Sequence, residues 1–172
     1  MFPTKKSQLI ENLINFSEKE LSKYSEKRNY DLGPPHKNVS KLSPYLRTRF
    51  ITEEEVLKIA VSNNNIKNIE KFIEEIFWRT YWKGWLETHP WIYDEYLNTN
   101  QHQPLLKKTG IKCFDYWKEE LLDTGYLHNH SRMWFASIWI FTLGYSWQSG
   151  ANFFKKNLLD YCPASNTLGW KW

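Results

Sequence analysis

Apolar residues in this chain of 172 residues recur at intervals of three and four positions and almost nowhere alternate with polar ones. That interval matches the turn of an α-helix, about 3.6 residues, whereas a half-buried strand has a period of about two. One such stripe runs from Leu9 to Leu21, and another runs from Ile66 to Ile76. The spacing therefore predicts an all-α fold.

Several short patterns predict where these helices begin and end. Thr52 and Glu55 have the spacing of a capping box, in which a hydroxyl and a carboxylate each satisfy a free amide at a helix start. Pro90 predicts the end of the long helix that begins near Ile66, because the residue before a proline disfavours the helical conformation. Three further helices are predicted around Phe114–Leu122, over Ser131–Leu143 with Gly144 as the cap, and around Phe153–Leu159, with a polar loop over Leu97–Gly110.

Composition sets wider limits. An apolar content of 41% against 24% charged residues indicates one folded domain, which we expect to span residues 1–172. The net charge of +4 permits an anionic partner without identifying one. The longest apolar run, Met133–Tyr145, is too short to cross a bilayer and the start is unlike a signal peptide, so we expect a cytoplasmic protein without a membrane partner. Cys113 and Cys162 fit no metal-ligand spacing, so we expect no metal site.

Arg132 stands near the start of an apolar helix and requires an anionic partner, because a buried guanidinium is costly without one. Asp160, at the end of the last predicted helix, is the available carboxylate. The two residues form either a structural ion pair or a pair that flanks a cofactor. Spacing alone favours the structural pair and leaves the other interpretation open.

Four stretches carry an ordered set of residue types: VSKLSPYL at Val39–Leu46, EEIFWRTYW at Glu74–Trp82, TGYLHNHSRMWFAS at Thr124–Ser137 and LLDYCPASNTLGWKW at Leu158–Trp172. In this order they resemble motifs of the helical flavin-binding domain of the photolyase and cryptochrome family. The resemblance is spread over the chain and does not rest on one motif. It implies an all-α domain that binds FAD among its helices.

The resemblance also implies which residues bind FAD. It places Tyr24 beside the cofactor, and at the phosphate end it places Ser40, Lys41, Leu42, Ser43 and Arg79. Around the flavin ring it places Asn129, Arg132, Asp160, Cys162 and Asn166. Asn166 corresponds to the residue that faces the reactive ring nitrogen, and Cys162 stands where the family has an aspartate.

Other matches concern electron transfer and the DNA lesion. Trp170 and Trp147 correspond to two members of a tryptophan chain that passes electrons to photoexcited flavin, and Glu75 corresponds to a carboxylate that hydrogen-bonds the dimer. The residues implied to contact the lesion or its DNA are Glu75, Trp78, Arg79, Asn129, His130, Met133 and Trp172. Asn129 and Met133 indicate the cyclobutane-dimer type, whereas His130 replaces an arginine that touches phosphate.

The implied function is light-dependent repair of cyclobutane pyrimidine dimers in DNA, by electron transfer from reduced FAD. Arg79, Lys83 and Lys171 are expected to neutralise DNA phosphates. Two alternatives stay open: a non-enzymatic, cryptochrome-like blue-light photoreceptor or flavin-binding module, and a decayed helical domain without a cofactor. Relative to the family, the chain is expected to be truncated, without the N-terminal antenna domain and the C-terminal end. The alternative is a minimal domain in which a protein partner supplies the missing parts of the site.

Overall fold

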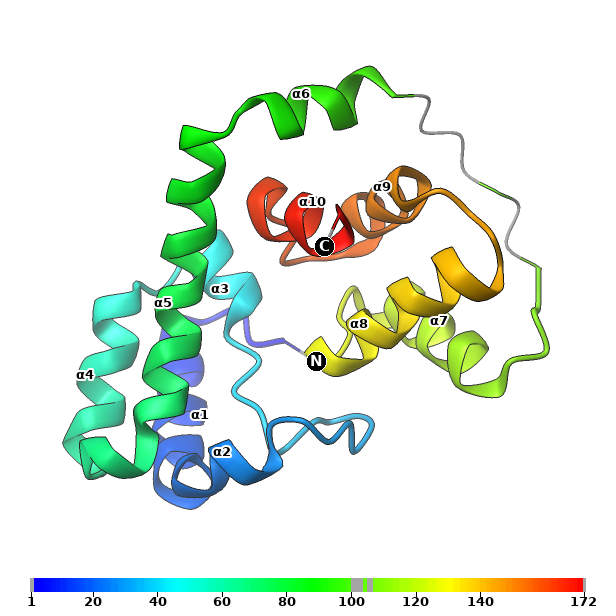
Figure 1. Ribbon diagram of the computed structural model, residues 1–172. Coiled ribbons are helices and arrows are strands. Elements are labelled where there is room, and N and C mark those ends of the chain that lie inside the picture. Colours follow the sequence, from blue (N-terminus) through cyan, green and yellow to red (C-terminus); the bar gives the residue numbers. More distant parts are fainter. Residues whose placement is uncertain (1, 100–103, 105–106, 172) are drawn as a thin grey trace. The chain divides into compact units, whose positions relative to one another are not determined.

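The structure, a computed structural model, describes residues 2–99, 104 and 107–171. It divides into two compact units, Met1–Arg79 (unit 1) and Thr80–Trp172 (unit 2). Within the described ranges every regular element is helical, as Figure 1 shows, so the predicted all-α fold is confirmed.

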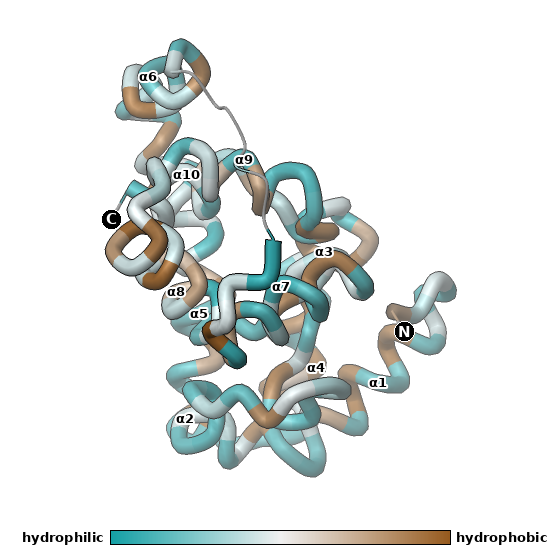
Figure 2. Tube along the Cα trace, turned by 90° about the vertical axis from the view of Figure 1, so that its right-hand side faces the viewer, coloured by the Kyte–Doolittle hydropathy of each residue, from teal (hydrophilic) through white to brown (hydrophobic). Residues whose placement is uncertain are grey.

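Unit 1 is built from short helices around one apolar core. Its elements are α1 (Lys6–Lys19), η1 (Leu21–Lys23), α2 (Tyr24–Lys27), α3 (Ser43–Arg47), α4 (Glu53–Asn63) and the first part of α5 (Ile66–Thr88). Leu9 and Leu13 of α1 are buried in the same core as Val56 and Ala60 of α4. Hydrophobic and hydrophilic positions are mixed along α1 in Figure 2, which is typical of a helix with one buried face.

The predicted capping box at the start of α4 is confirmed. The Thr52 hydroxyl accepts a hydrogen bond from the Glu55 amide at 3.2 Å, and Glu55 Oε2 accepts one from the Thr52 amide at 2.9 Å. The predicted end of α5 is confirmed as well, because the helix stops at Thr88, just before His89 and Pro90.

Unit 2 contains the rest of α5 and an aromatic core. Its further elements are α6 (Trp91–Asn98), α7 (Lys112–Thr124), α8 (Asn129–Ser137), η2 (Ile138–Thr142), α9 (Trp147–Asn157) and α10 (Pro163–Lys171). The Phe135 ring stacks on Phe114 at a centroid distance of 4.3 Å and on Phe153 at 5.9 Å. Trp139, fully buried, also stacks on Phe135, with a centroid distance of 5.8 Å.

Two expectations for unit 2 need correction. The helix predicted to run to Leu143 changes at Ile138 into the π-helical turn η2, in which the Leu143 amide bonds to the Ile138 carbonyl at 2.9 Å. A residue of this wider turn also contacts the loop that follows it, because the Trp139 indole N–H donates a hydrogen bond to the Ser146 carbonyl at 3.1 Å. Two helices, α6 and α10, were not predicted, so α9 is not the last helix.

Among the described residues, no helix combines the length and the apolar character that crossing a lipid bilayer requires.

Candidate functional site

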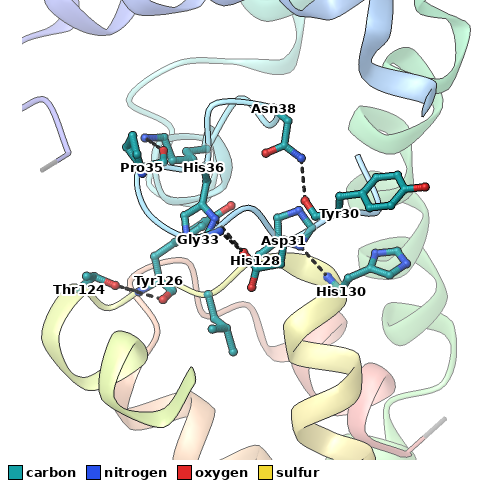
Figure 3. A network of polar contacts seen from close by, with 12 residues as sticks. Tyr30, Asp31, Gly33, Pro35, His36, Asn38, Thr124, Tyr126, His128 and His130 are labelled. Carbon is teal, nitrogen blue, oxygen red and sulfur yellow. Dashed lines mark hydrogen bonds and ion pairs between the residues drawn. The ribbon is translucent and has the colours of Figure 1, made fainter. Parts of the chain in front are cut away.

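The segment Ser40–Ser43 of unit 1 leads from a loop into α3. Asn38 fixes this loop, because its Nδ2 donates to the Tyr30 carbonyl at 2.7 Å (Figure 3). The same Nδ2 also donates to the Lys27 carbonyl at 2.8 Å. Lys41 has a φ of 53°, a left-handed conformation that residues other than glycine seldom adopt. The segment therefore has an unusual backbone shape that neighbouring contacts maintain.

Two side chains of this segment have unused hydrogen-bonding groups. Neither the Ser40 hydroxyl nor the Ser43 hydroxyl is hydrogen-bonded within the described part of the chain, and both residues are half-buried. The Lys41 ammonium donates to the Pro35 carbonyl at 2.7 Å, and burial lowers its pKa. Leu42 is buried in the core of unit 1 and anchors the segment. Two hydroxyl donors are thus held in place beside an anchored side chain.

Arg79 is the last residue of unit 1, and its side chain is 13% exposed. The nearest carboxylate oxygen, Glu53 Oε1, lies 3.9 Å from its Nε. Two guanidinium nitrogens, Nε and Nη2, are buried and donate no hydrogen bond within the described residues. A buried guanidinium without acceptors is costly, so this arrangement indicates an acceptor that the described chain does not supply.

Tyr24 and Glu75 lie together in unit 1, beside Arg28. The Arg28 Nη1 lies 2.9 Å from Glu75 Oε1, and the Tyr24 ring meets Phe72 edge-on at 5.3 Å. Burial and the charge of Glu75 raise the pKa of Tyr24 to about 12, although Arg28 opposes the shift. Trp78 is exposed on α5. The structure therefore brings Tyr24 and Glu75 together through an arginine that the sequence did not single out.

In unit 2, the predicted ion pair between Arg132 and Asp160 is present. Arg132 Nη1 and Nη2 donate to the two Asp160 oxygens at 3.0 and 2.8 Å, and Nε donates to the Leu127 carbonyl at 2.8 Å. The Asp160 side chain is 3% exposed. Burial alone would lower the pKa of Arg132, but the charge and hydrogen bonds of Asp160 raise it. The Tyr126 ring lies 5.5 Å from the guanidinium carbon.

The first five residues of α8 include three more predicted residues. Asn129 and Met133 are exposed, and His130 is half-buried. His128 caps this helix, because its Nδ1 accepts a hydrogen bond from the His130 amide at 3.2 Å. The positions of these side chains relative to a flavin or a DNA lesion remain a prediction.

Asn166 and Cys162 belong to α10 and the turn before it. Asn166 is buried, and its Nδ2 donates to the Ala151 carbonyl of α9 at 3.0 Å. Cys162 is buried, and its carbonyl accepts a hydrogen bond from the Asn166 amide at 2.9 Å. The chain itself therefore fixes the Asn166 amide group, whereas its contact with a flavin nitrogen stays a prediction.

Trp170 and Trp147 have different aromatic neighbours. Trp170 is buried and meets Phe154 at 5.0 Å and Trp139 at 6.0 Å, both edge-on. Trp147 stacks on Tyr96 at 5.9 Å. Both tryptophans pack in the aromatic core of unit 2, so their proposed electron transfer is additional to a packing role.

The remaining predicted residues are less well placed to bind DNA, or cannot be assessed. Trp172 lies outside the described residues. Lys171 forms an ion pair with Glu95, so its ammonium already has a carboxylate partner, and Lys83 is half-buried.

Two residues near the candidate site, Arg28 and Tyr126, were not predicted from the sequence. Arg28 follows Tyr24 by one helical turn, a spacing that indicated their proximity but not the contact with Glu75.

These residues fit FAD, the cofactor that the resemblance implies. The buried Arg79 nitrogens and the hydroxyls of Ser40 and Ser43 are donors of the kind that bind a diphosphate. In unit 2, Arg132 and Asp160 form a fixed pair of charges. Such a pair can set the charge environment of a redox-active ring.

Comparison with protein families gives one match, described as the FAD binding domain of DNA photolyase, over residues 72–172. This range includes Glu75, Arg79 and all the candidate residues of unit 2 but not Tyr24 or Ser40–Ser43.

Individual relatives extend the similarity to almost the whole chain. A deoxyribodipyrimidine photo-lyase of Alkalihalophilus pseudofirmus is 28% identical over 95% of this chain and 36% of its own length. A cryptochrome DASH of Arabidopsis thaliana is 32% identical over 90% of this chain and 30% of its own length. The crystal structure of a class III photolyase from Agrobacterium tumefaciens has a TM-score of 0.74 at 25% identity, over 97% of this chain and 37% of that one. The chain thus spans about a third of the length of the curated relatives it matches.

Proposed function

Because this chain belongs to the family of FAD-binding domains of DNA photolyases, we propose that it is a flavoprotein domain for light-dependent repair of cyclobutane pyrimidine dimers in DNA. FAD is the cofactor that the family match identifies. The observation that carries the proposal for this chain is Arg79, whose two buried nitrogens lack acceptors. A cofactor phosphate would supply them.

The residues of unit 1 have two roles in this proposal. Ser40, Ser43 and Arg79 donate hydrogen bonds to the phosphates, and Leu42 holds their segment to the core. Glu75 and Trp78 bind the lesion, by a hydrogen bond and by stacking. A damaged base is weakly stacked in its duplex, which lowers the cost of extruding it into such a site.

The residues of unit 2 act at the ring of the cofactor. Arg132 and Asp160 provide a fixed charge pair, and Asn166, held by Ala151, presents its amide to the ring. Bound and reduced FAD would supply, under light, the electron needed to split the dimer, with no net redox change. Trp170 and Trp147 are assigned to electron supply from the protein.

The test begins with flavin binding. The purified protein is mixed with FAD, and the free cofactor is removed. The proposal expects flavin absorbance to remain with the protein. The reduced complex is then illuminated with an oligonucleotide that contains one thymine dimer, and a matched sample stays dark. Repair in the illuminated sample alone is the expected result, whereas protein that retains no flavin would contradict the whole proposal.

A second candidate function is a blue-light photoreceptor without repair activity. It is favoured by the cryptochrome DASH relative, which is 32% identical over 90% of this chain, and by His130, which stands where the resemblance implies an arginine on DNA phosphate. The same experiment separates the two candidates. A photoreceptor binds flavin and changes its spectrum in light, but leaves the dimer intact.

A further inference from the structure

Two cations lie near one carboxylate oxygen of Glu75 on α5. Arg28 Nη1 lies 2.9 Å from Glu75 Oε1, and Lys71 Nζ lies 3.6 Å from that same oxygen. Arg28 follows α2 directly, and Lys71 stands one helical turn before Glu75 and donates its hydrogen bond to the neighbouring Glu74 at 2.7 Å. Arg28 therefore holds this oxygen directly, and Lys71 acts on it only through its charge.

The other oxygen has no such contact. Glu75 Oε2 accepts no hydrogen bond within the described residues, and the side chain is 29% exposed. Trp78, which is 44% exposed, follows three positions later on α5, and residues at that spacing are neighbours on a helix surface. An open acceptor and an accessible flat ring thus lie next to each other on α5.

Tyr24 provides a second sign that this cluster is organised. Its hydroxyl is largely buried, and both Glu75 and Arg28 act on it, since the carboxylate raises the pKa of Tyr24 while the guanidinium lowers it. The edge-on contact between Tyr24 and Phe72 at 5.3 Å ties the ring to the core of unit 1. Arg28 and Glu75 are therefore paired beside a rigid aromatic side chain, which restricts both of them.

We propose that Arg28 and Lys71 are positioning residues, which hold Oε1 of Glu75 so that Oε2 accepts a hydrogen bond from the imide N–H of a pyrimidine stacked on Trp78. This inference rests on the proposed function, since the ligand is the lesion. A glutamate side chain free to rotate would lose conformational freedom on binding. A carboxylate already held by Arg28, with the charge of Lys71 beside the same oxygen, avoids much of that loss and presents one acceptor in one direction.

The experiment measures discrimination by the full chain loaded with FAD. The first probe is an oligonucleotide with one thymine dimer, and the second is the same oligonucleotide with methyl groups on the imide nitrogens of the dimer. The ratio of the two dissociation constants reports whether Glu75 accepts a hydrogen bond from the imide N–H of the dimer. We expect the wild type to favour the first probe by about tenfold or more, because a hydrogen bond to a charged acceptor is lost. The Glu75→Leu variant gives the ratio that steric hindrance alone produces.

Arg28→Met should bring the ratio down to that of Glu75→Leu, and Lys71→Met should lower it by about two- to threefold, because its contact is longer. Arg28→Lys, which keeps the charge, should retain most of the discrimination and shows that the loss does not come from misfolding. Lys67→Met is the matched control, since Lys67 is exposed on the same helix and makes no ion pair with Glu75. It should leave the ratio unchanged.

Two outcomes would overturn the inference, and only the second would also overturn the proposed function. If Arg28→Met weakens both probes equally and lowers the salt dependence of binding by about one phosphate contact, Arg28 binds DNA backbone and does not position Glu75. If the wild type binds the dimer no better than undamaged DNA, the proposed function fails and the inference fails with it.

Discussion

The Arg132–Asp160 pair and Asn166 of unit 2 find their polar partners within the chain, whereas the phosphate-end residues Arg79, Ser40 and Ser43 of unit 1 leave donors unused. Arg132 and Asp160 form two hydrogen bonds with each other, and Asn166 is bonded to Ala151. In contrast, Arg79 has two buried nitrogens without acceptors, and the hydroxyls of Ser40 and Ser43 have no partner within the described residues. These residues of unit 2 therefore form a finished framework, by which we mean that their hydrogen bonds are satisfied without a ligand. The residues of unit 1 still have donors that a ligand can satisfy.

This difference has an energetic consequence. Changing a residue of a finished framework removes interactions that exist without ligand, so the free energy of unfolding falls in the apo protein. Changing a residue with unused donors removes only interactions with the ligand, so FAD affinity falls while the apo protein keeps its stability.

Asp160→Ala should cause the greatest loss of stability. It leaves the Arg132 guanidinium without its carboxylate, and a broken buried pair typically costs about 3–5 kcal/mol. We expect about 3 kcal/mol here, the lower end, because the Arg132 side chain is 22% exposed. Urea unfolding of the apo protein measures the loss, and the exposed Asp123→Ala on α7 is the control. An apo protein of unchanged stability would show that the pair depends on the cofactor.

Gly150→Ala tests whether the apolar framework of unit 2 is equally complete. A methyl group at Gly150 would lie 2.2 Å from Cζ3 of the buried Trp170, so the indole must move. Overpacking of this kind costs about 1–3 kcal/mol. Gly84→Ala is the matched control, since nothing lies within 4 Å of its added methyl group, and there a gain of up to about 1 kcal/mol is expected from helix propensity. Equal stability changes in the two variants would contradict close packing around Trp170.

Arg79→Met should weaken FAD binding and spare the fold. Loss of charge-assisted hydrogen bonds to phosphate lowers affinity by about 10–100-fold. The apo protein should keep or slightly increase its free energy of unfolding, because two buried donors without acceptors disappear. Fluorescence titration of FAD measures the first effect and urea unfolding the second. Lys67→Met, which removes an exposed charge from the same helix, should change neither. A destabilised apo protein with normal FAD affinity would assign Arg79 to the framework.

Ser40→Ala and Ser43→Ala should have the weakest effects. Each removes one neutral donor, which corresponds to about fivefold in FAD affinity. Ser22→Ala, an exposed position in η1, serves as the control. An undiminished affinity in the double variant of Ser40 and Ser43 would exclude this segment from the phosphate end of the site.

The features that the sequence predicted are those that a strong local rule determines. The capping box of Thr52 and the stop of α5 before Pro90 follow from backbone chemistry. The pairing of Arg132 with Asp160 follows from the cost of a buried charge, which leaves few partners to choose from. The cofactor and most of the individual residue roles were inferred from the family resemblance and not from physical rules.

The features that the sequence did not predict lack such a rule. The buried face of α10 includes Asn166 and Thr167, so its polar residues hide the helical stripe, although Pro163 at its first position was a usable signal. The π-helical turn η2 spans only Ile138–Thr142, which is too short for its period to be told from that of an α-helix. The contact between Arg28 and Glu75 joins two ordinary charged residues far apart in the chain, and nothing local selects that pair.

Hydrogen exchange of the protein with and without FAD separates a finished framework from one that the ligand completes. In the apo protein, the amides of α8 and α9, which flank the Arg132–Asp160 pair and Trp170, should already exchange slowly, and those of residues 40–43, which precede the hydrogen-bonded amides of α3, should exchange faster. Adding FAD should slow exchange in residues 40–43 and around Arg79 by about tenfold or more, as expected for groups that gain partners. The account is contradicted if residues 40–43 are as protected as α8 and α9 before FAD is added, or if α8 and α9 become protected only afterwards.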